Sequence, residues 1–113
     1  MADAFGLAHC EVLKTLAKTE LPFAVCTIYD CNFADAQTAQ LVGTALALFN
    51  EAIIRNAVEC GLPVIDLRLV CAEAEDYANE IEPSVQGDQK IAGAIWRVVE
   101  EHDWEKKLTT IYS

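Results

Sequence analysis

Basic residues are scarce in this chain: Lys and Arg total 8, against 18 Asp and Glu, and the formal net charge is −10. Binding to nucleic acid depends on clustered Lys and Arg that neutralise phosphates. We therefore expect no nucleic-acid partner. The acids are scattered, with a denser run in "CAEAEDYANEIE". We interpret them mainly as a solvated acidic surface.

Long apolar runs are also missing, because none reaches the roughly 18 residues that suggest a membrane span. The first residues, "MADAFGLAHCEVLKTLAK", contain early acids and lack the basic start and unbroken apolar stretch of a signal peptide. We expect no membrane span and a cytoplasmic location. Hydrophobic residues make up 53% of the chain, which is ample for a packed core. The length fits a single domain over residues 1–113.

The cysteines form no Cys-x-x-Cys pair, and their number is odd. Zinc sites usually need such close spacing, and no Gly-rich phosphate loop is present either. We therefore expect no metal, no cofactor and free, mostly buried thiols. A reactive thiol stays open as an alternative, since two of the cysteines follow predicted strands. The cysteines are Cys10, Cys26, Cys31, Cys60 and Cys71, and the two in question are Cys31 and Cys71.

Histidine and serine, two members of a Ser–His–Asp triad, are rare. The histidines are His9 and His102, which we interpret as surface or helix-end residues, and the serines are Ser84 and Ser113. A triad needs a histidine that can take the serine proton. The sequence contains no Gly-x-Ser-x-Gly turn, the motif that exposes a nucleophilic serine. The sequence therefore argues against a triad within this chain.

Two short apolar runs are typical of β-strands buried on both faces. "FAVCTIY" follows Pro22, and "VIDLRLV" follows Pro63. The segment between them, residues 38–61, has the pattern of a long helix, with Thr38 as its N-cap and Gly61 as its C-terminal stop. Strand, helix and strand in this order predict a parallel βαβ unit with a right-handed crossover.

Further helices are expected at residues 5–19 and 87–101, which fits the layering of an α/β domain. A complete sheet usually has about five strands, and the sequence contains only two convincing ones. The tail after residue 101 either docks through Trp104, Leu108 and Ile111 or frays. The pattern resembles part of a doubly wound domain more than a whole one.

Acidic residues gather where a site would form. In parallel α/β sheets, sites lie beyond the carboxyl ends of the strands, here residues 29–32 and 66–68. The loop 69–86 leaves the second strand on the same edge and contains Asp76 and Glu82, with Asp66 near them. Two close carboxylates can act as an acid and a base. A solvated acidic loop is the alternative.

Three stretches, in this order and spacing, resemble the C-terminal half of SGNH hydrolases, also called GDSL-type esterases and lipases. "LPFAVCTIYDCNF" is similar to the family strand that follows its oxyanion-hole Asn block. "LFNEAIIRNAVECGLPVIDLRLV" is similar to the next helix and strand. "DYANEIEPSVQGDQKIAGAI" is similar to the final block, where Asp-x-x-His-Pro leads through a Gly into the last helix. The similarity extends over roughly residues 5–100.

The resemblance implies a flavodoxin-like three-layer α/β/α fold, of which this chain holds an incomplete part. It also implies hydrolysis of esters by a serine nucleophile, a histidine base, an orienting aspartate and an oxyanion hole. Glu82 occupies the position of the family histidine, and Asn79 occupies that of the aspartate. We take these as the catalytic-position candidates, with Asp66, Asp76 and Ser84 as further residues at the edge of the site.

The chain departs from the family at each catalytic position. It contains neither the Gly-Asp-Ser block nor the Gly-x-Asn-Asp block. Glutamate is a much weaker base than imidazole near neutral pH. We therefore expect no ester turnover from the chain alone. One explanation is a missing N-terminal half that would complete a site for a small ester. The other is a binding or dimerisation module, since a half-sheet exposes a strand edge.

Overall fold

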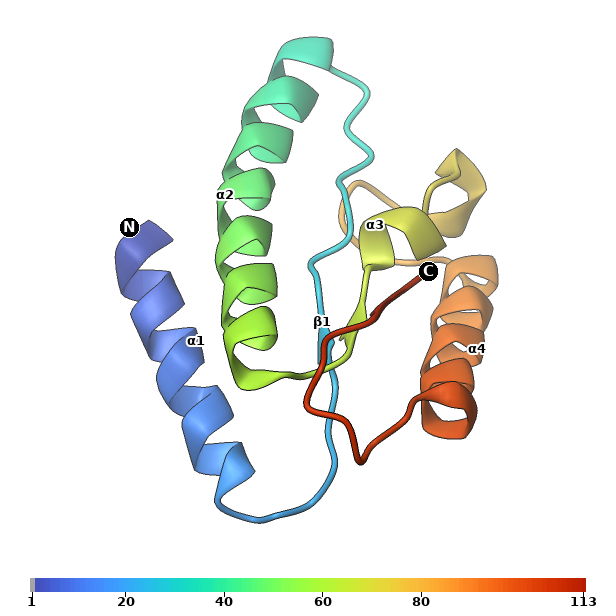
Figure 1. The fold of residues 1–113 in the computed structure, drawn as a ribbon. Helices are drawn as coiled ribbons and strands as arrows, with labels where there is room; N and C mark the ends of the chain where they lie inside the picture. Colours follow the sequence, from blue (N-terminus) through green and yellow to red (C-terminus); the bar gives the residue numbers. More distant parts are fainter. Residues whose placement is uncertain (1) are drawn as a thin grey trace.

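A computed structural model describes residues 2–113. Over this range the chain forms four α-helices, a 3₁₀ turn and three short strands (Figure 1). In chain order these are α1 Ala2–Ala17, β1 Val25–Cys26, α2 Ala36–Cys60, β2 Val64–Ile65, α3 Leu67–Val70, η1 Ala74–Asp76, α4 Val85–Glu101 and β3 Ile111–Tyr112.

The strands form one parallel sheet in the order β1-β2-β3. Val25 pairs with Val64, and Val64 pairs with Ile111 on its other side. The parallel β1–α2–β2 unit predicted from the sequence is therefore confirmed. The third strand lies in the tail, where Tyr112 is 8% exposed. Of the two alternatives for the tail, docking is the one that the structure shows, but it occurs through Trp104 and Tyr112, whereas Leu108 and Ile111 are exposed. The sequence did not predict a strand there.

The flavodoxin-like three-layer α/β/α fold expected from the sequence is wrong. Each strand is two residues long, and more than half of the described residues are helical. The strand order follows the chain order and does not reverse, whereas a doubly wound sheet has a point of reversal. The chain forms a small, mostly helical globule with a short parallel ladder.

Polar side chains shorten both predicted strands by binding backbone groups that a longer sheet would use. Asn50 of α2 accepts a hydrogen bond from Ile28 N at 2.7 Å and donates one to Ile28 O at 3.0 Å. Asp66 accepts a hydrogen bond from Arg68 N at 3.2 Å and caps α3. "FAVCTIY" is therefore a strand only at Val25–Cys26, and "VIDLRLV" turns into a helix after Ile65.

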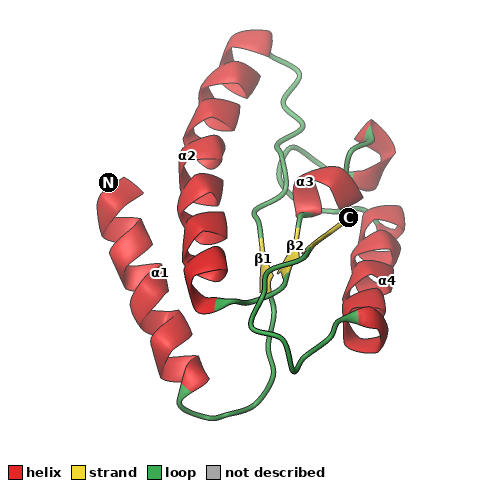
Figure 2. Cartoon of the chain, viewed as in Figure 1, coloured by secondary structure: helices red, strands yellow, loops and turns green. Residues whose placement is uncertain are grey.

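Apolar side chains pack in two clusters on opposite sides of the strands. Figure 2 shows α1 and α2 on one side and α4 on the other. Successive residues of a strand point to opposite faces, so Val64 packs towards α2 and Ile65 towards α4. The first cluster contains Leu13, Val25, Ile53, Ala57 and Val64, and the second contains Ile65, Leu67, Val70, Cys71, Ala94, Val98 and Tyr112.

The long helix α2 begins and ends at capped residues. Asp35 is its N-cap, and its side chain accepts a hydrogen bond from Thr38 N at 2.9 Å. The expectation that Thr38 is the N-cap is therefore wrong by about one turn, because Asp35, three residues earlier, caps the helix and binds the amide of Thr38 itself. Gly61 ends the helix with φ of 67°, in the left-handed region that glycine adopts easily, as predicted.

Among the described helices, α2 is the one with the length and apolar composition to cross a membrane. Only 22% of its most apolar window is buried in the structure. One such helix is weak evidence, since core helices pass the same test. The absence of a membrane span stays a prediction, as does the cytoplasmic location.

Candidate functional site

The carboxyl edge of the sheet gathers three segments that are far apart in the sequence. Thr27, just after β1, donates a hydrogen bond to Asp66 Oδ1 at 3.0 Å. Asn32 N donates a hydrogen bond to Glu80 O at 2.8 Å. The rings of Tyr29 and Tyr77 pack edge to face, with their centroids 5.9 Å apart. The loop after α3 therefore folds back onto the edge where the sequence places the candidate site.

An apolar cavity of about 360 Å³ opens at this edge. Its walls come from the segment after β1, the first half of α2, α3 and the loop that returns to the edge. The lining residues are Thr27, Ile28, Tyr29, Asp30, Cys31, Val42, Leu46, Leu67 and Ile81. Ligand pockets are commonly concave and mostly apolar with few polar groups, so this cavity has the composition of a binding site.

Asp66 is a buried structural anchor of this edge. Its side chain is bound by the Arg68 guanidinium at 2.8 and 2.9 Å and by the Thr27 hydroxyl. These hydrogen bonds, chiefly the one from Arg68, lower the pKa of Asp66. A carboxylate held in this way stays ionised, so it does not suit the role of a general acid near neutral pH.

Asp76 is also fully buried and bound to a cation of its own. Lys90 Nζ of α4 lies 2.8 Å from Asp76 Oδ1, and Gln86 donates to the same oxygen at 2.8 Å. Oδ2 accepts a hydrogen bond from Glu73 N at 3.0 Å. The hydrogen bond from Lys90, more than any other contact, lowers the pKa of Asp76 to about 2. Asp76 thus attaches the returning loop to α4.

The Asp76–Lys90 pair should make the stability of the chain fall steeply in acid. The pKa of Asp76 is about 2 in the fold and 3.8 ordinarily, so its stabilising effect is present above about pH 4 and is lost as the pH falls towards 2. We expect the urea midpoint to depend less on pH between these values in Asp76→Asn and in Lys90→Met than in the wild type. Urea titrations followed by circular dichroism measure this, and equal pH dependence in all three chains would contradict it.

Asn79 and Glu82 lie together at the tip of a hairpin-like turn. Ser84 N donates to Asp76 O at 2.7 Å, and Ala78 N donates to Glu82 O at 2.8 Å. Asn79 Oδ1 accepts hydrogen bonds from Ile81 N and Glu82 N, both at 2.9 Å. Asn79 therefore contacts the backbone of Glu82, and both residues are exposed to solvent.

Ser84 is the N-cap of α4. Its hydroxyl accepts a hydrogen bond from Gly87 N at 3.1 Å and donates one to Glu75 O at 2.6 Å. The hydroxyl proton is therefore directed at a backbone carbonyl and not at a base. An activated nucleophile needs a base within hydrogen-bond reach, and the described contacts of Ser84 provide none.

The expected carboxylate pair is replaced by separate ion pairs, since Asp66 binds Arg68 and Asp76 binds Lys90. The histidines lie elsewhere: His9 Nδ1 is 3.1 Å from Asn56 Nδ2, and His102 ends α4. Within residues 2–113, no three His, Cys, Asp or Glu side chains lie close enough to hold a metal ion.

Thr27 and Lys90 hold the edge together, and the sequence analysis missed both. Thr27 bridges β1 to Asp66 and accepts a hydrogen bond from Leu67 N at 2.9 Å. The available signal was a lone polar residue inside an apolar strand. Lys90 lies 14 residues after Asp76, a separation that no local pattern identifies.

The thiols are divided between the core and the surface. Cys71 is 1% exposed and packs in the cluster beside α4, and burial raises the pKa of its thiol. Cys31 is half-buried and contributes to the apolar cavity. Cys26 and Cys60 are exposed, so the expectation of mostly buried thiols is only partly correct.

Comparison with curated proteins identifies a distant relative. The chain is similar to the GDSL esterase/lipase CPRD49 of Arabidopsis thaliana, with 34% identity over 65 residues. The match covers 53% of this chain and 25% of the plant protein, so the chain spans about a quarter of that relative's length. No family model and no solved structure matches the chain. These findings support a partial, distant relationship to GDSL-type hydrolases.

Proposed function

We propose that this chain supplies the C-terminal part of a GDSL-type hydrolase domain and does not hydrolyse esters by itself. The similarity to a plant GDSL esterase/lipase supports the class. The turn that contains Asn79 and Glu82 leads through Ser84 into α4, which is the order of elements that the family has in its final block. The chain thereby provides a scaffold for the edge of a site.

The observation that carries the proposed lack of turnover is the arrangement of the turn itself. Glu82, at the position of the family histidine, is exposed at the tip of the turn. Ser84 holds the end of a helix. Acyl transfer needs a nucleophile and a base in contact, together with donors that stabilise the oxyanion. The described side chains of this edge do not form that set.

Hydrolysis of p-nitrophenyl butyrate by the purified chain tests the proposal. We expect the wild type and Glu82→Ala to match the buffer blank. An Asn79→Asp/Glu82→His double variant, which restores both family residues of the turn, should stay at the blank as well, because the serine is absent. Exposed thiols can attack activated esters, so each chain is also assayed after alkylation with iodoacetamide.

Turnover by the alkylated wild type that Glu82→Ala abolishes would contradict the proposal and make Glu82 part of a non-standard site. Turnover by the wild type that alkylation abolishes would favour a cysteine-dependent reaction, and Cys26 and Cys60 would be the first candidates. Turnover that appears only in the double variant would mean that the chain contains a nucleophile this proposal does not recognise.

A non-catalytic dimerisation module is the second candidate, and the exposed side of α4 favours it. Ile95, Trp96 and Val99 are 46%, 62% and 56% exposed and lie on one helix face. A discrete dimer in size-exclusion chromatography with light scattering would favour this candidate. A Gly-Asp-Ser block encoded upstream in the same reading frame would favour the hydrolase domain.

A further inference from the structure

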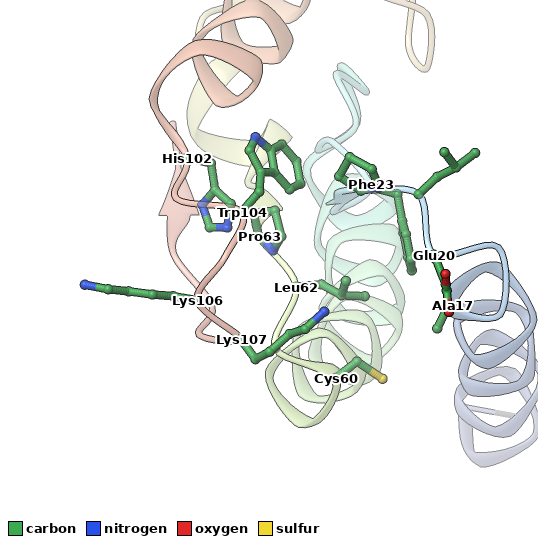
Figure 3. Close-up of a pocket in the computed structure, with 13 residues that line it drawn as sticks. Ala17, Glu20, Phe23, Cys60, Leu62, Pro63, His102, Trp104, Lys106 and Lys107 are labelled. Carbon is green, nitrogen blue, oxygen red and sulfur yellow. The ribbon is translucent and has the colours of Figure 1, made fainter.

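A second cavity, of about 290 Å³, lies at the opposite, amino edge of the sheet. Figure 3 shows side chains around it that come from three distant parts of the chain. These are the end of α1 with the loop to β1, the turn between α2 and β2, and the segment after α4. Phe23 and Pro63, which come just before β1 and β2, belong to the lining. The cavity is therefore separate from the candidate site at the carboxyl edge.

The backbone around this cavity is tightly joined. A Cβ added at Gly61 would lie 2.4 Å from Lys107 O, so the α2–β2 turn and the tail touch directly. Thr109 Oγ1 donates to Ala57 O at 3.2 Å, and Val64 N donates to Thr110 O at 2.9 Å. These contacts hold two of the three walls at fixed positions, and a preformed site loses less entropy on binding.

Trp104 provides a flat apolar surface whose orientation is fixed. The ring of His102 packs edge to face against it, with centroids 4.8 Å apart. His102 is itself held in place because its Nδ1 lies 2.9 Å from the Tyr112 hydroxyl. Trp104 is half-buried and lines the cavity with Phe23 and Leu62. An apolar ligand group can therefore pack against rings that are already in position.

The charge at this cavity differs from that of the rest of the chain. The net charge is −10, yet the chain's one pair of adjacent cations, Lys106 and Lys107, lines the cavity. Figure 3 shows Lys107 extending towards Leu62 and Cys60, whereas Lys106 extends away from the other lining residues. Lys106 lies 4.0 Å from Asp103, while within residues 2–113 Lys107 forms no ion pair.

We propose that this cavity binds a small organic carboxylate. Its anionic group pairs with the ammonium of Lys107, and its apolar part packs against Trp104 and Phe23. A charge-assisted hydrogen bond to an ammonium is stronger than a neutral one. The volume lies near the lower end of the range for ligand pockets, which suits a ligand of on the order of ten non-hydrogen atoms. Glu20, on the opposite rim, opposes the anion and limits the affinity.

Titration of the ¹⁵N-labelled chain with phenylacetate and with hexanoate, followed by amide chemical shifts, tests the proposal. We expect saturable shifts at Gly61, Leu62 and the indole N–H of Trp104, and much smaller ones with the neutral phenylacetamide. Lys107→Ala should weaken binding roughly three- to tenfold, and Glu20→Gln should strengthen it. Lys14→Ala is the matched control, since it removes the same charge from an exposed lysine of α1 that does not line the cavity, and it should change the dissociation constant less than about twofold.

Several results would overturn the proposal. One is the absence of shifts with both carboxylates at about 20 mM, well above a millimolar dissociation constant. Another is equal binding of phenylacetamide, which would leave an apolar cavity without selectivity for an anion. Equal losses in Lys14→Ala and Lys107→Ala would mean that general charge, and not the position of Lys107, attracts the ligand. Shifts confined to the cavity at the carboxyl edge would place the site elsewhere. The outcome does not depend on whether the chain hydrolyses esters.

Discussion

Replacing Gly87 with alanine is expected to lower the free energy of unfolding by about 2 to 3 kcal/mol, in the upper part of the range for overfilling a packed site. Gly87 lies in the first turn of α4 and is buried. A Cβ added there would lie 2.2 Å from Asp76 O and 3.2 Å from the Pro83 side chain. Asp76 O cannot simply move away, because it accepts the hydrogen bond from Ser84 N at 2.7 Å.

Gly93→Ala in the same helix is the matched control. Nothing lies within 4 Å of a Cβ added at Gly93, and Gly93 is exposed. Alanine has a higher helix propensity than glycine, so this variant should gain up to about 1 kcal/mol. Urea unfolding followed by circular dichroism should therefore move the two midpoints in opposite directions. A Gly87→Ala midpoint at or above that of the wild type would show that the turn moves freely away from α4.

The consequence of Gly87→Ala for the candidate site follows from the same contact. Asp76 and Ser84 form the base of the turn that exposes Asn79 and Glu82. A side chain at position 87 would push this base away from α4 and strain the Asp76–Lys90 ion pair. The glycine that leads into the last helix, one of the residues on which the resemblance to GDSL-type hydrolases rests, therefore has a physical role here. It allows the turn and the helix to approach at backbone distance.

The three long helices α1, α2 and α4 were predictable from the sequence because each has an apolar stripe or a clear end. Ile91, Ala94 and Val98 recur at helical spacing in α4, and Ala94 and Val98 are buried. Gly61 ends α2 as its position suggested. The parallel pairing of β1 and β2 followed from the long helix between two apolar runs. These features depend on neighbouring residues, which a pattern along the chain can reveal.

The extent of the sheet was not predictable in the same way. The strands are short because Asn50 binds Ile28, which lies 22 residues earlier, and because Asp66 starts a helix where the apolar run continues. The run "TTIYS" contains only two residues of β3, with polar residues on either side. One of these contacts joins residues far apart in the sequence and the other is a local helix cap, and the periodicity of apolar residues detects neither.

The candidate site shows the same division. The edge was predicted, since the loop after α3 does return to the carboxyl ends of β1 and β2. The pairing of the charged residues at this edge was not predicted, because Asp66 binds Arg68 and Asp76 binds Lys90. Ser84 was predicted as a residue at the edge of the site, whereas in the structure it is the N-cap of α4.

Asn50→Ala is the second substitution with a large expected effect, a loss of about 2 to 4 kcal/mol in the free energy of unfolding. Asn50 is completely buried, and its amide group satisfies both the N–H and the C=O of Ile28. Alanine would leave both backbone groups without these partners, and an unsatisfied buried polar group costs about 1 to 3 kcal/mol. The truncation also leaves a small cavity beside the first cluster, which adds to the loss.

Gln40→Ala provides the control for Asn50→Ala, because Gln40 is an exposed residue of the same helix and its truncation should change stability by less than about 0.5 kcal/mol. The two variants are compared by urea unfolding, and amide hydrogen exchange at Ile28 reports the local effect. Ile28 belongs to the wall of the cavity at the carboxyl edge, so faster exchange there would show that Asn50 holds this wall as well as the core. Wild-type stability with unchanged exchange in Asn50→Ala would mean that water or a neighbouring group replaces both hydrogen bonds. The short length of β1 would then need a cause other than Asn50.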